Sequence, residues 1–290
     1  MRPTALVTGV GGPAGRAGAA WLAERGYRVV GTDIREVPSP AAVLRVVPPA
    51  RDPAFAEALL RVAEEEGAGI VIPTVTEELP LVARLRPALR ARGIACTVSD
   101  LPGIDVAGDK LLTAEQLRAS GVQAPDTFPG ATPRAALLVT LGLPLLSKPR
   151  FGRGGRGVQV HRTEEEVVRA GPDEVVWQAF LPGEEYDVNL FLERDGTAPA
   201  AVTLRKTGLR EGLVGNAIAV ERVDRPDVAA LGVAAGRALG LFGPLDVDIR
   251  MGTDGVPAVL EVNARLGANV LSAREVLVAL DDAWRNGRCA

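Results

Sequence analysis

Three polar side chains alternate with apolar residues near the end of the chain, at Glu261, Asn263 and Arg265. On a β-strand, a period of two places all three on one face. Carboxylate and amide oxygens are ligands for Mg²⁺, and a guanidinium binds phosphate oxygens through a fork of N–H donors. A hairpin through 252–255 would bring the carboxylate of Asp248 beside Glu261. The spacing predicts a site for Mg²⁺ and a polyphosphate, although an ordinary hairpin with solvated charges has the same pattern.

A second segment, residues 150–157, contains four glycines and three arginines and follows a strand expected at 143–149 that ends in Lys148–Pro149. Glycine lets backbone N–H groups approach a phosphate closely, and arginine balances the phosphate charge. The segment is not a P-loop, because Gly-x-x-x-x-Gly-Lys-Ser/Thr is absent. It predicts a flap that closes over a nucleotide, with a mobile basic hairpin as the alternative.

Composition limits the function classes. The 290 residues suffice for two or three packed lobes. A net charge of −3 does not favour nucleic-acid binding driven by bulk electrostatics. No apolar run approaches about 18 residues, so no membrane span is expected. Cys96 and Cys289 are too few for a disulfide framework, which makes the reducing cytoplasm the expected compartment.

Lysine is rare in this chain. Of 33 lysine and arginine residues, only Lys110, Lys148 and Lys206 are lysines. A lysine presents a compact ammonium where arginine presents a planar fork, so each surviving lysine is a candidate for a site that needs a point charge. Coding bias is the alternative explanation.

The first hundred residues alternate between strand and helix patterns. We expect strands at 4–8, 28–33, 69–73 and 94–98, and helices at 16–25, 53–66 and 77–92. Such alternation is typical of a small parallel sheet covered by helices.

The glycine turn 9–15 and Asp33 also fit a dinucleotide site. A short-chain type of NAD(P)-dependent oxidoreductase or epimerase would need a Tyr-x-x-x-Lys pair. The residues four positions after Tyr27 and Tyr186 are Gly31 and Leu190, so this alternative is disfavoured.

Further elements are expected along the rest of the chain. The patterns predict helices at 109–119, 163–170, 226–240 and 272–285, and strands at 158–161, 174–181, 197–206 and 214–222.

Several motifs, in this order, resemble those of the ATP-grasp superfamily. They are Gly108–Asp109–Lys110 at the head of a helix, Lys148–Pro149 with its glycine segment, the stretch 178–186, and Glu261-x-Asn263-x-Arg265. Within the superfamily the chain is most similar to the branch of the carbamoyl-phosphate synthetase large subunit and the pyrrolysine-pathway ligase. The resemblance implies an α/β and α+β fold, with a Rossmann-like parallel-sheet (pre-ATP-grasp) domain over 1–104. An ATP-grasp domain would follow over 105–290, with a mobile lid subdomain at about 143–180.

The resemblance also implies roles for individual residues. Lysines and the lid would contact the ATP phosphates, the segment after the lid would contact adenine, and a glutamate would take the ribose hydroxyls: Lys110, Lys148, Arg153, Gly154, Gly155, Gln178, Phe180 and Glu185. Mg²⁺, or Mn²⁺ in its place, would be held by Asp248, Glu261 and Asn263, and Arg265 would stabilise the transferring phosphoryl group. Gln178 stands where relatives commonly have glutamate, and Asp248 where some have glutamine.

The implied reaction joins a carboxylate and an amine of small molecules, with amino acids among the candidates, through an acyl phosphate, releasing ADP and phosphate. A non-catalytic Mg-ATP-binding regulatory protein of the same fold is the second hypothesis, and the possible assembly is a homodimer. For the substrate pocket we predict the segment 203–210 with Asn269, and a catalytic role for Lys206 and Arg210. Arg205, Lys206 and Arg210 would gather positive charge for a substrate carboxylate, unless this segment is a solvated strand edge.

Overall fold

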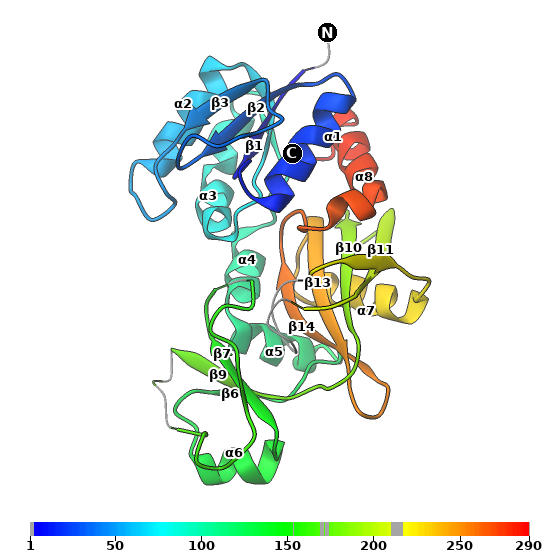
Figure 1. Ribbon diagram of the computed structural model, residues 1–290. Coiled ribbons are helices and arrows are strands. Elements are labelled where there is room, and N and C mark those ends of the chain that lie inside the picture. Colours follow the sequence, from blue (N-terminus) through cyan, green and yellow to red (C-terminus); the bar gives the residue numbers. More distant parts are fainter. Residues whose placement is uncertain (1–2, 153, 169–170, 172–173, 210–216, 290) are drawn as a thin grey trace.

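The computed structural model describes residues 3–152, 154–168, 171, 174–209 and 217–289. Three β-sheets follow one another along the molecule, a parallel one at the N-terminal end, a long antiparallel one in the middle and a small antiparallel one at the far end (Figure 1). The combination confirms the predicted mixed α/β class. None of the described helices has the length and apolar character needed to cross a membrane.

The N-terminal sheet has the strand order β3-β2-β1-β4-β5, and all its pairs are parallel. Its strands are β1 (Thr4–Thr8), β2 (Arg28–Asp33), β3 (Val43–Val46), β4 (Ala68–Ile72) and β5 (Ala95–Cys96). Three helices and a short 3₁₀ helix connect them: α1 (Pro13–Glu24), α2 (Phe55–Glu65), η1 (Thr76–Glu78) and α3 (Leu79–Arg90). The predicted alternation is confirmed, and β3 is the strand that we missed.

Glycine is required where β1 turns into α1. Gly9 has a φ of +60°, a region that glycine occupies without strain. A Cβ on Gly15 would lie 2.3 Å from the carbonyl oxygen of Gly9. The first turn of α1 therefore packs directly on the end of β1.

Two helices lead from the first sheet to the third. These are α4 (Leu101–Gly108) and α5 (Lys110–Ala119). The small sheet that follows has the order β6-β9-β7-β8 and carries one more helix, α6. Its elements are β6 (Thr127–Pro129), α6 (Arg134–Leu141), β7 (Leu145–Pro149), β8 (Gln159–His161) and β9 (Val175–Ala179).

Three predictions concern this region. The predicted domain boundary after residue 104 falls within α4 and stays a prediction. The helix predicted at 163–170 is wrong in its described part, where 164–166 form only a turn. The predicted lid subdomain over about 143–180 also stays a prediction, and β6, which lies before these bounds, pairs with β9.

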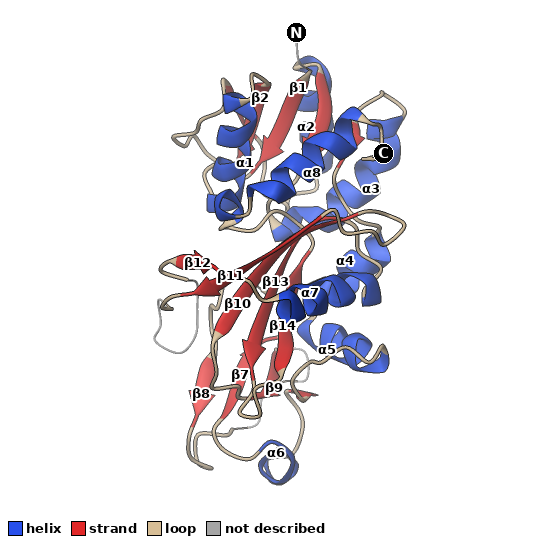
Figure 2. Ribbon diagram, turned by 90° about the vertical axis from the view of Figure 1, so that its right-hand side faces the viewer, coloured by secondary structure: helices blue, strands red, loops and turns tan. Residues whose placement is uncertain are grey.

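The central sheet is antiparallel and has the order β12-β11-β10-β13-β14. Its strands are β10 (Glu185–Leu192), β11 (Ala200–Lys206), β12 (Val220–Arg222), β13 (Gly243–Met251) and β14 (Pro257–Asn263). Helix α7 (Pro226–Ala238) packs against β10, β11, β13 and β14 (Figure 2). The predicted hairpin is confirmed, because Asp248 on β13 pairs with Glu261 on β14.

The last helix, α8 (Arg274–Arg285), follows a short 3₁₀ helix, η2 (Val270–Ser272), and returns to the N-terminal lobe. The hydroxyl of Tyr27 donates to the carboxylate of Asp281, and the Tyr27 ring stacks on Trp284 with centroids 5.2 Å apart. The apolar face of α8 shares one core with α1 and β10. Helix α8 therefore contributes to the core of the N-terminal lobe.

Two glycines of α4 make a matched test of packing. A Cβ on Gly103 would lie 2.7 Å from the backbone oxygen of Leu239, whereas one on Gly108 meets nothing within 4 Å. Gly103→Ala should lower the free energy of unfolding by about 2 kcal/mol, because the backbone at 239–240 cannot yield easily. Gly108→Ala should leave it unchanged or raise it by up to about 1 kcal/mol. Urea denaturation followed by circular dichroism measures both, and equal effects would contradict this packing.

Candidate active site

A cavity of about 1140 Å³ lies where the three sheets meet. The central sheet supplies its charged floor, the small sheet supplies Lys148 and Gln178, and the N-terminal sheet supplies the glycine turn of β1 and α1. Residues far apart in sequence therefore face one space. All three lysines of the chain, Lys110, Lys148 and Lys206, line it.

The floor follows from strict alternation along the central strands. Val188, Leu190 and Val247 are fully buried in the core against α7. Their neighbours Asp187 and Asp246 point to the opposite face and line the cavity. The pattern that hides the apolar half of the sheet thus exposes its polar half to the cavity.

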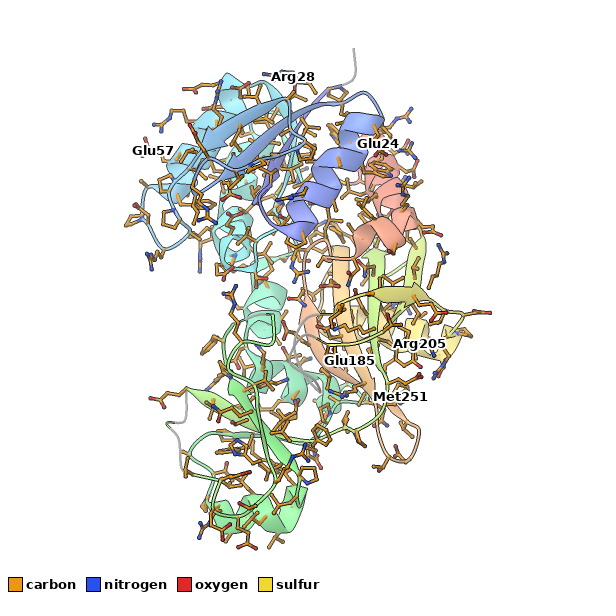
Figure 3. All side chains as sticks on the ribbon, in the orientation of Figure 1. Glu24, Arg28, Glu57, Glu185, Arg205 and Met251 are labelled. Atoms are coloured by element: carbon orange, nitrogen blue, oxygen red, sulfur yellow. The ribbon has the colours of Figure 1, made fainter. Side chains whose placement is uncertain are left out.

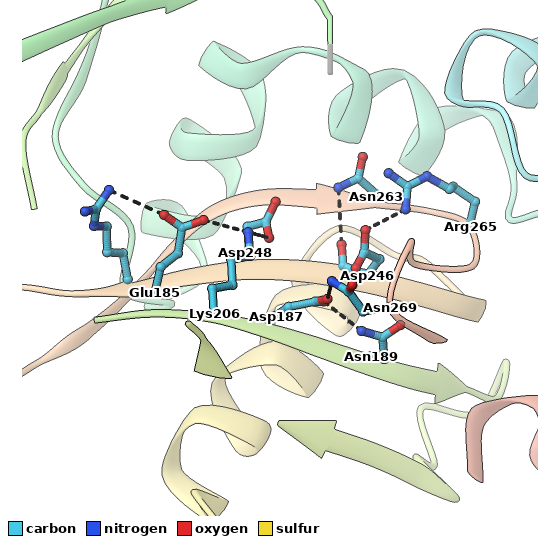
Figure 4. A network of polar contacts seen from close by, with 10 residues as sticks. Glu185, Asp187, Asn189, Lys206, Asp246, Asp248, Asn263, Arg265 and Asn269 are labelled. Atoms are coloured by element: carbon cyan, nitrogen blue, oxygen red, sulfur yellow. Dashed lines mark hydrogen bonds and ion pairs between the residues drawn. The ribbon is translucent and has the colours of Figure 1, made fainter. Parts of the chain in front are cut away.

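Lys206 lies at the centre of one group of charges. Its ammonium contacts an oxygen of Glu185 and an oxygen of Asp248, each at 2.6 Å (Figure 4). The other oxygen of Glu185 lies 3.4 Å from Arg250. Burial disfavours the ammonium, but the carboxylates of Asp248 and Glu185 outweigh it and raise the pKa of Lys206. Burial also raises the pKa of Asp248, to about 7.

A second group lies further along the same face. Arg265 donates to Asp246 at 2.5 Å, and Asn189 and Asn269 donate to the two oxygens of Asp187 at 2.7 and 2.8 Å (Figure 4). Burial and the charge of Asp246 raise the pKa of Asp187 well above its usual range. Arg265 overcomes the effect of burial on Asp246 and lowers its pKa. The negative charge is therefore favoured on Asp246 over Asp187.

The residues present fit a divalent cation. Asp248 and Glu261 pair across β13 and β14, and Asn263 follows on the same strand as Glu261. Their hard oxygen donors suit Mg²⁺. Asp248 already holds a cationic group, the ammonium of Lys206. No cluster of three His, Cys, Asp or Glu side chains with metal-binding geometry occurs among the described residues, so the set depends on the Asn263 amide.

The other two lysines of the cavity, Lys110 and Lys148, lie near Glu261. Lys110 lies 3.7 Å from an oxygen of Glu261 and donates to the carbonyl of Gly152 at 2.7 Å. Lys148 donates to the carbonyl of Leu260 at 3.2 Å. Burial lowers the pKa of Lys148 to about 8, against the opposing pull of Glu261.

The start of the glycine-rich segment is fixed to α5. Asp109 caps this helix by accepting from the N–H of Leu111 at 3.0 Å. The same carboxylate accepts from Arg150, at 2.9 Å from Nε and 2.7 Å from Nη2. The N–H of Lys110 donates to the carbonyl of Arg150 at 3.1 Å. Lys110 and the base of the segment are thus positioned together.

The residues predicted to contact adenine divide into two. Gln178 is buried, lines the cavity and donates to the hydroxyl of Thr127 at 2.8 Å. Phe180 is outside the described cavity lining, and its ring lies 5.6 Å from the guanidinium of Arg250. Of these two residues, Gln178 lines the cavity and Phe180 does not, and their contact with adenine stays a prediction.

The remaining predicted residues vary in outcome. Gly154 and Gly155 line the cavity, whereas Arg153 and Arg210 lie outside the described residues. Arg205 does not join Lys206, because adjacent residues on β11 point to opposite faces. Its guanidinium pairs with Glu184 at 3.1 Å and Glu221 at 2.6 Å, toward the outside of the molecule (Figure 3).

The carboxylate of Asp33 accepts hydrogen bonds from the protein's own backbone. One of its oxygens accepts from the N–H of Gly11 at 2.9 Å, and the other accepts from Ile34 at 2.8 Å. This carboxylate therefore stabilises the glycine turn, which weakens the dinucleotide alternative.

Sequence reasoning missed Asp187 and Asp246 in the floor. Both could have been found from the period of two, since Asp187 follows Glu185 and Asp246 precedes Asp248 on the same strand face.

Two Asp–Arg pairs of α5 allow a test of burial. Asp109→Asn keeps an N-cap but removes the negative charge that pairs with the largely buried guanidinium of Arg150, so it should lower the free energy of unfolding by about 3 kcal/mol. Asp126→Asn breaks the pair with Arg118, in which both side chains are about half exposed, and should cost less than about 1 kcal/mol. Chemical denaturation compares the two variants, and equal losses would refute the anchoring role of Asp109.

The lowered pKa of Lys148 predicts a pH dependence. Phosphate binds the ammonium and not the amine, and a group with a pKa of about 8 loses its proton as the pH rises through that value. Affinity for a non-hydrolysable ATP analogue should therefore fall about three- to tenfold from pH ~7 to ~9. Lys148→Arg should flatten this change, because guanidinium stays charged. Isothermal titration calorimetry tests this, and a pH-independent wild type would contradict it.

Comparison with known proteins agrees with this geometry. The sequence profile of the ATP-grasp domain matches residues 107–269. The chain is 28% identical over 243 residues to the phosphoribosylamine–glycine ligase of Allochromatium vinosum, which covers 72% of this chain and 55% of that protein. It spans about half the length, or less, of the curated relatives it matches.

Solved structures share the fold. An L-amino acid ligase from Bacillus licheniformis matches with a TM-score of 0.75 at 19% identity, over 98% of this chain and 74% of its own. The biotin carboxylase domain dimer of 2-oxoglutarate carboxylase from Hydrogenobacter thermophilus, in complex with MgADP, ADP and bicarbonate, has a TM-score of 0.72 at 15% identity, over 97% of this chain and 70% of its own. Since the family profile covers more than half of the chain and the cavity lies within that region and the sheet before it, the protein belongs to the ATP-grasp family.

Proposed function

We propose that the protein is an ATP-dependent carboxylate–amine ligase that acts on small molecules, with amino acids among the candidates. The observation that carries the proposal is the position of the lysines. The only three lysines of the chain line one cavity, together with Asp248, Glu261 and Arg265. Phosphoryl transfer requires charge neutralisation and alignment more than a nucleophilic side chain, and this lining provides both.

The reaction would have two steps. A carboxylate oxygen of the acid attacks the γ-phosphorus of ATP, and the bond to the β-phosphate oxygen breaks to release ADP. The amine nitrogen then attacks the acyl carbon, the bond to phosphate breaks, and a proton leaves the nitrogen. The products are an amide, ADP and phosphate.

Each side chain has a place in this scheme. Lys110 and Lys148 would bind phosphate oxygens of ATP, and Glu185 would accept from the ribose hydroxyls. Asp248, Glu261 and Asn263 would hold Mg²⁺, or Mn²⁺, whose charge neutralises the phosphates when it is bound. Arg265, already oriented by Asp246 at 2.5 Å, would stabilise charge on the transferred phosphoryl group.

Lid and substrate contacts extend the proposal. Arg153, Gly154 and Gly155 would cover the phosphates, and the segment that carries Gln178 and Phe180 would hydrogen-bond adenine through its backbone. The pocket for the substrate carboxylate would include Lys206, Arg210 and Asn269. The comparisons point to phosphoribosylamine–glycine and amino acid ligases, so the narrower likeness to the carbamoyl-phosphate synthetase and pyrrolysine-pathway branch stays a prediction. A homodimer, a cytoplasmic location and the two-domain division remain predictions as well.

Glu261→Gln tests the metal assignment. Loss of this carboxylate should reduce substrate-dependent ADP release at least about 100-fold, because the charge that holds the cation is removed. Glu184→Gln is the matched control, since this glutamate is exposed and pairs with Arg205 outside the cavity. Near-wild-type turnover by Glu261→Gln would refute the assignment.

The assay itself separates the hypotheses. The protein is incubated with Mg-ATP and pooled amino acids and small carboxylates, and ADP, AMP, phosphate and new condensation masses are measured. Acceptor-dependent ADP with a dehydrated adduct supports the ligase. AMP with pyrophosphate contradicts the acyl phosphate, and tight Mg-ATP binding without turnover in any pool supports the non-catalytic regulatory protein.

A further inference from the structure

The ammonium of Lys206 already occupies one oxygen of Asp248, a residue proposed to bind the divalent cation. It is 2.6 Å from an oxygen of Asp248 and 2.6 Å from an oxygen of Glu185, and its side chain is 8% exposed. Asp187 adds a third carboxyl near the ammonium. A divalent metal at Asp248 and this ammonium would repel each other at such distances, because like charges a few ångströms apart interact strongly in a buried site.

We infer that Lys206 is a built-in counter-cation that competes with the divalent metal for Asp248. The metal then binds well only together with the nucleotide, whose phosphate oxygens give the ammonium another partner. Metal and nucleotide binding are thereby coupled, and each increases affinity for the other by the same factor. The inference rests on the proposed Mg-ATP site and adds an order of loading to it.

Three features of the structure support this competition. The two carboxylates that hold Lys206 come from neighbouring strands, β10 and β13, and the strand register places Asp187 of β10 opposite Asp248 of β13. Arg250 neutralises the far oxygen of Glu185 at 3.4 Å, so it does not replace Lys206 at Asp248. Lys110 and Lys148 contact the carbonyls of Gly152 and Leu260, on the Glu261 side of the floor. Among the described residues, Lys206 alone forms an ion pair with Asp248.

The experiment measures Mn²⁺ binding by the intact protein, with and without a non-hydrolysable ATP analogue, by electron paramagnetic resonance and calorimetry. Lys206→Met and Lys206→Gln should bind Mn²⁺ alone at least about tenfold more tightly than wild type, since a charge that repels the metal is gone. The coupling between Mn²⁺ and the analogue should shrink by a similar factor.

Three controls make the result specific. Arg205→Met removes a charge from the adjacent position of β11, outside the cavity, and should leave Mn²⁺ affinity unchanged. Lys206→Arg keeps the positive charge and should behave like wild type. Adding Asp248→Asn to Lys206→Met should abolish the gain, because the gained affinity is for that carboxylate.

The outcomes are distinct. Unchanged Mn²⁺ affinity in the folded neutral variants overturns the inference, as does a gain that survives Asp248→Asn. If both neutral variants fail to fold, the wild-type protein still provides the test. Mn²⁺ binding by the wild type that is as tight without the analogue as with it overturns the inference. Failure of the wild type to bind Mn²⁺ with the analogue refutes the proposed Mg-ATP site instead.

Discussion

The central antiparallel sheet is constrained because one of its faces packs in the apolar core and the other carries the polar row of the cavity. Along β10, the core requires the apolar side chains of Tyr186, Val188 and Leu190 to be buried. The polar row requires polar side chains at the positions that alternate with them, Glu185, Asp187 and Asn189. A slip of one residue would exchange the two sets, so the register that fills the apolar core also aligns the polar row. The stability of the core and the geometry of the site are therefore set by the same hydrogen bonds.

Charge matching makes that polar row tolerable. Carboxylates out of water are costly unless each has a cation or a proton. Asp246 forms an ion pair with Arg265, and Lys206 forms ion pairs with both Glu185 and Asp248. The carboxyl of Asp187 is hydrogen-bonded, and its pKa is raised. In a site with so many internal partners, the proposed Mg-ATP would exchange one set of charge pairs for another.

Much of this arrangement was predictable. The hairpin that joins Asp248 to Glu261, the parallel sheet and the importance of the three lysines follow from local patterns of period, turn residues and composition. Other features depend on tertiary contacts that no local pattern carries. Helix α4 begins like a turn, but its Gly103 packs closely against the backbone at 239–240, and Arg205 pairs with Glu221 on β12. The Phe180 ring likewise lies 5.6 Å from the guanidinium of Arg250, which is distant in sequence.

The position of α8 bears on how the chain reaches this fold. The hydrogen-bond partner of Tyr27, Asp281, lies 254 positions further along the chain, and the N–H of Cys96 donates to the carbonyl of Cys289 at 3.1 Å. Contacts of such long sequence separation are slow to form, because the intervening chain must first be ordered. During synthesis from the N-terminus, the first sheet therefore keeps an apolar flank exposed until the last helix has been made. That interval is the period in which a growing chain of this protein would depend most on chaperones.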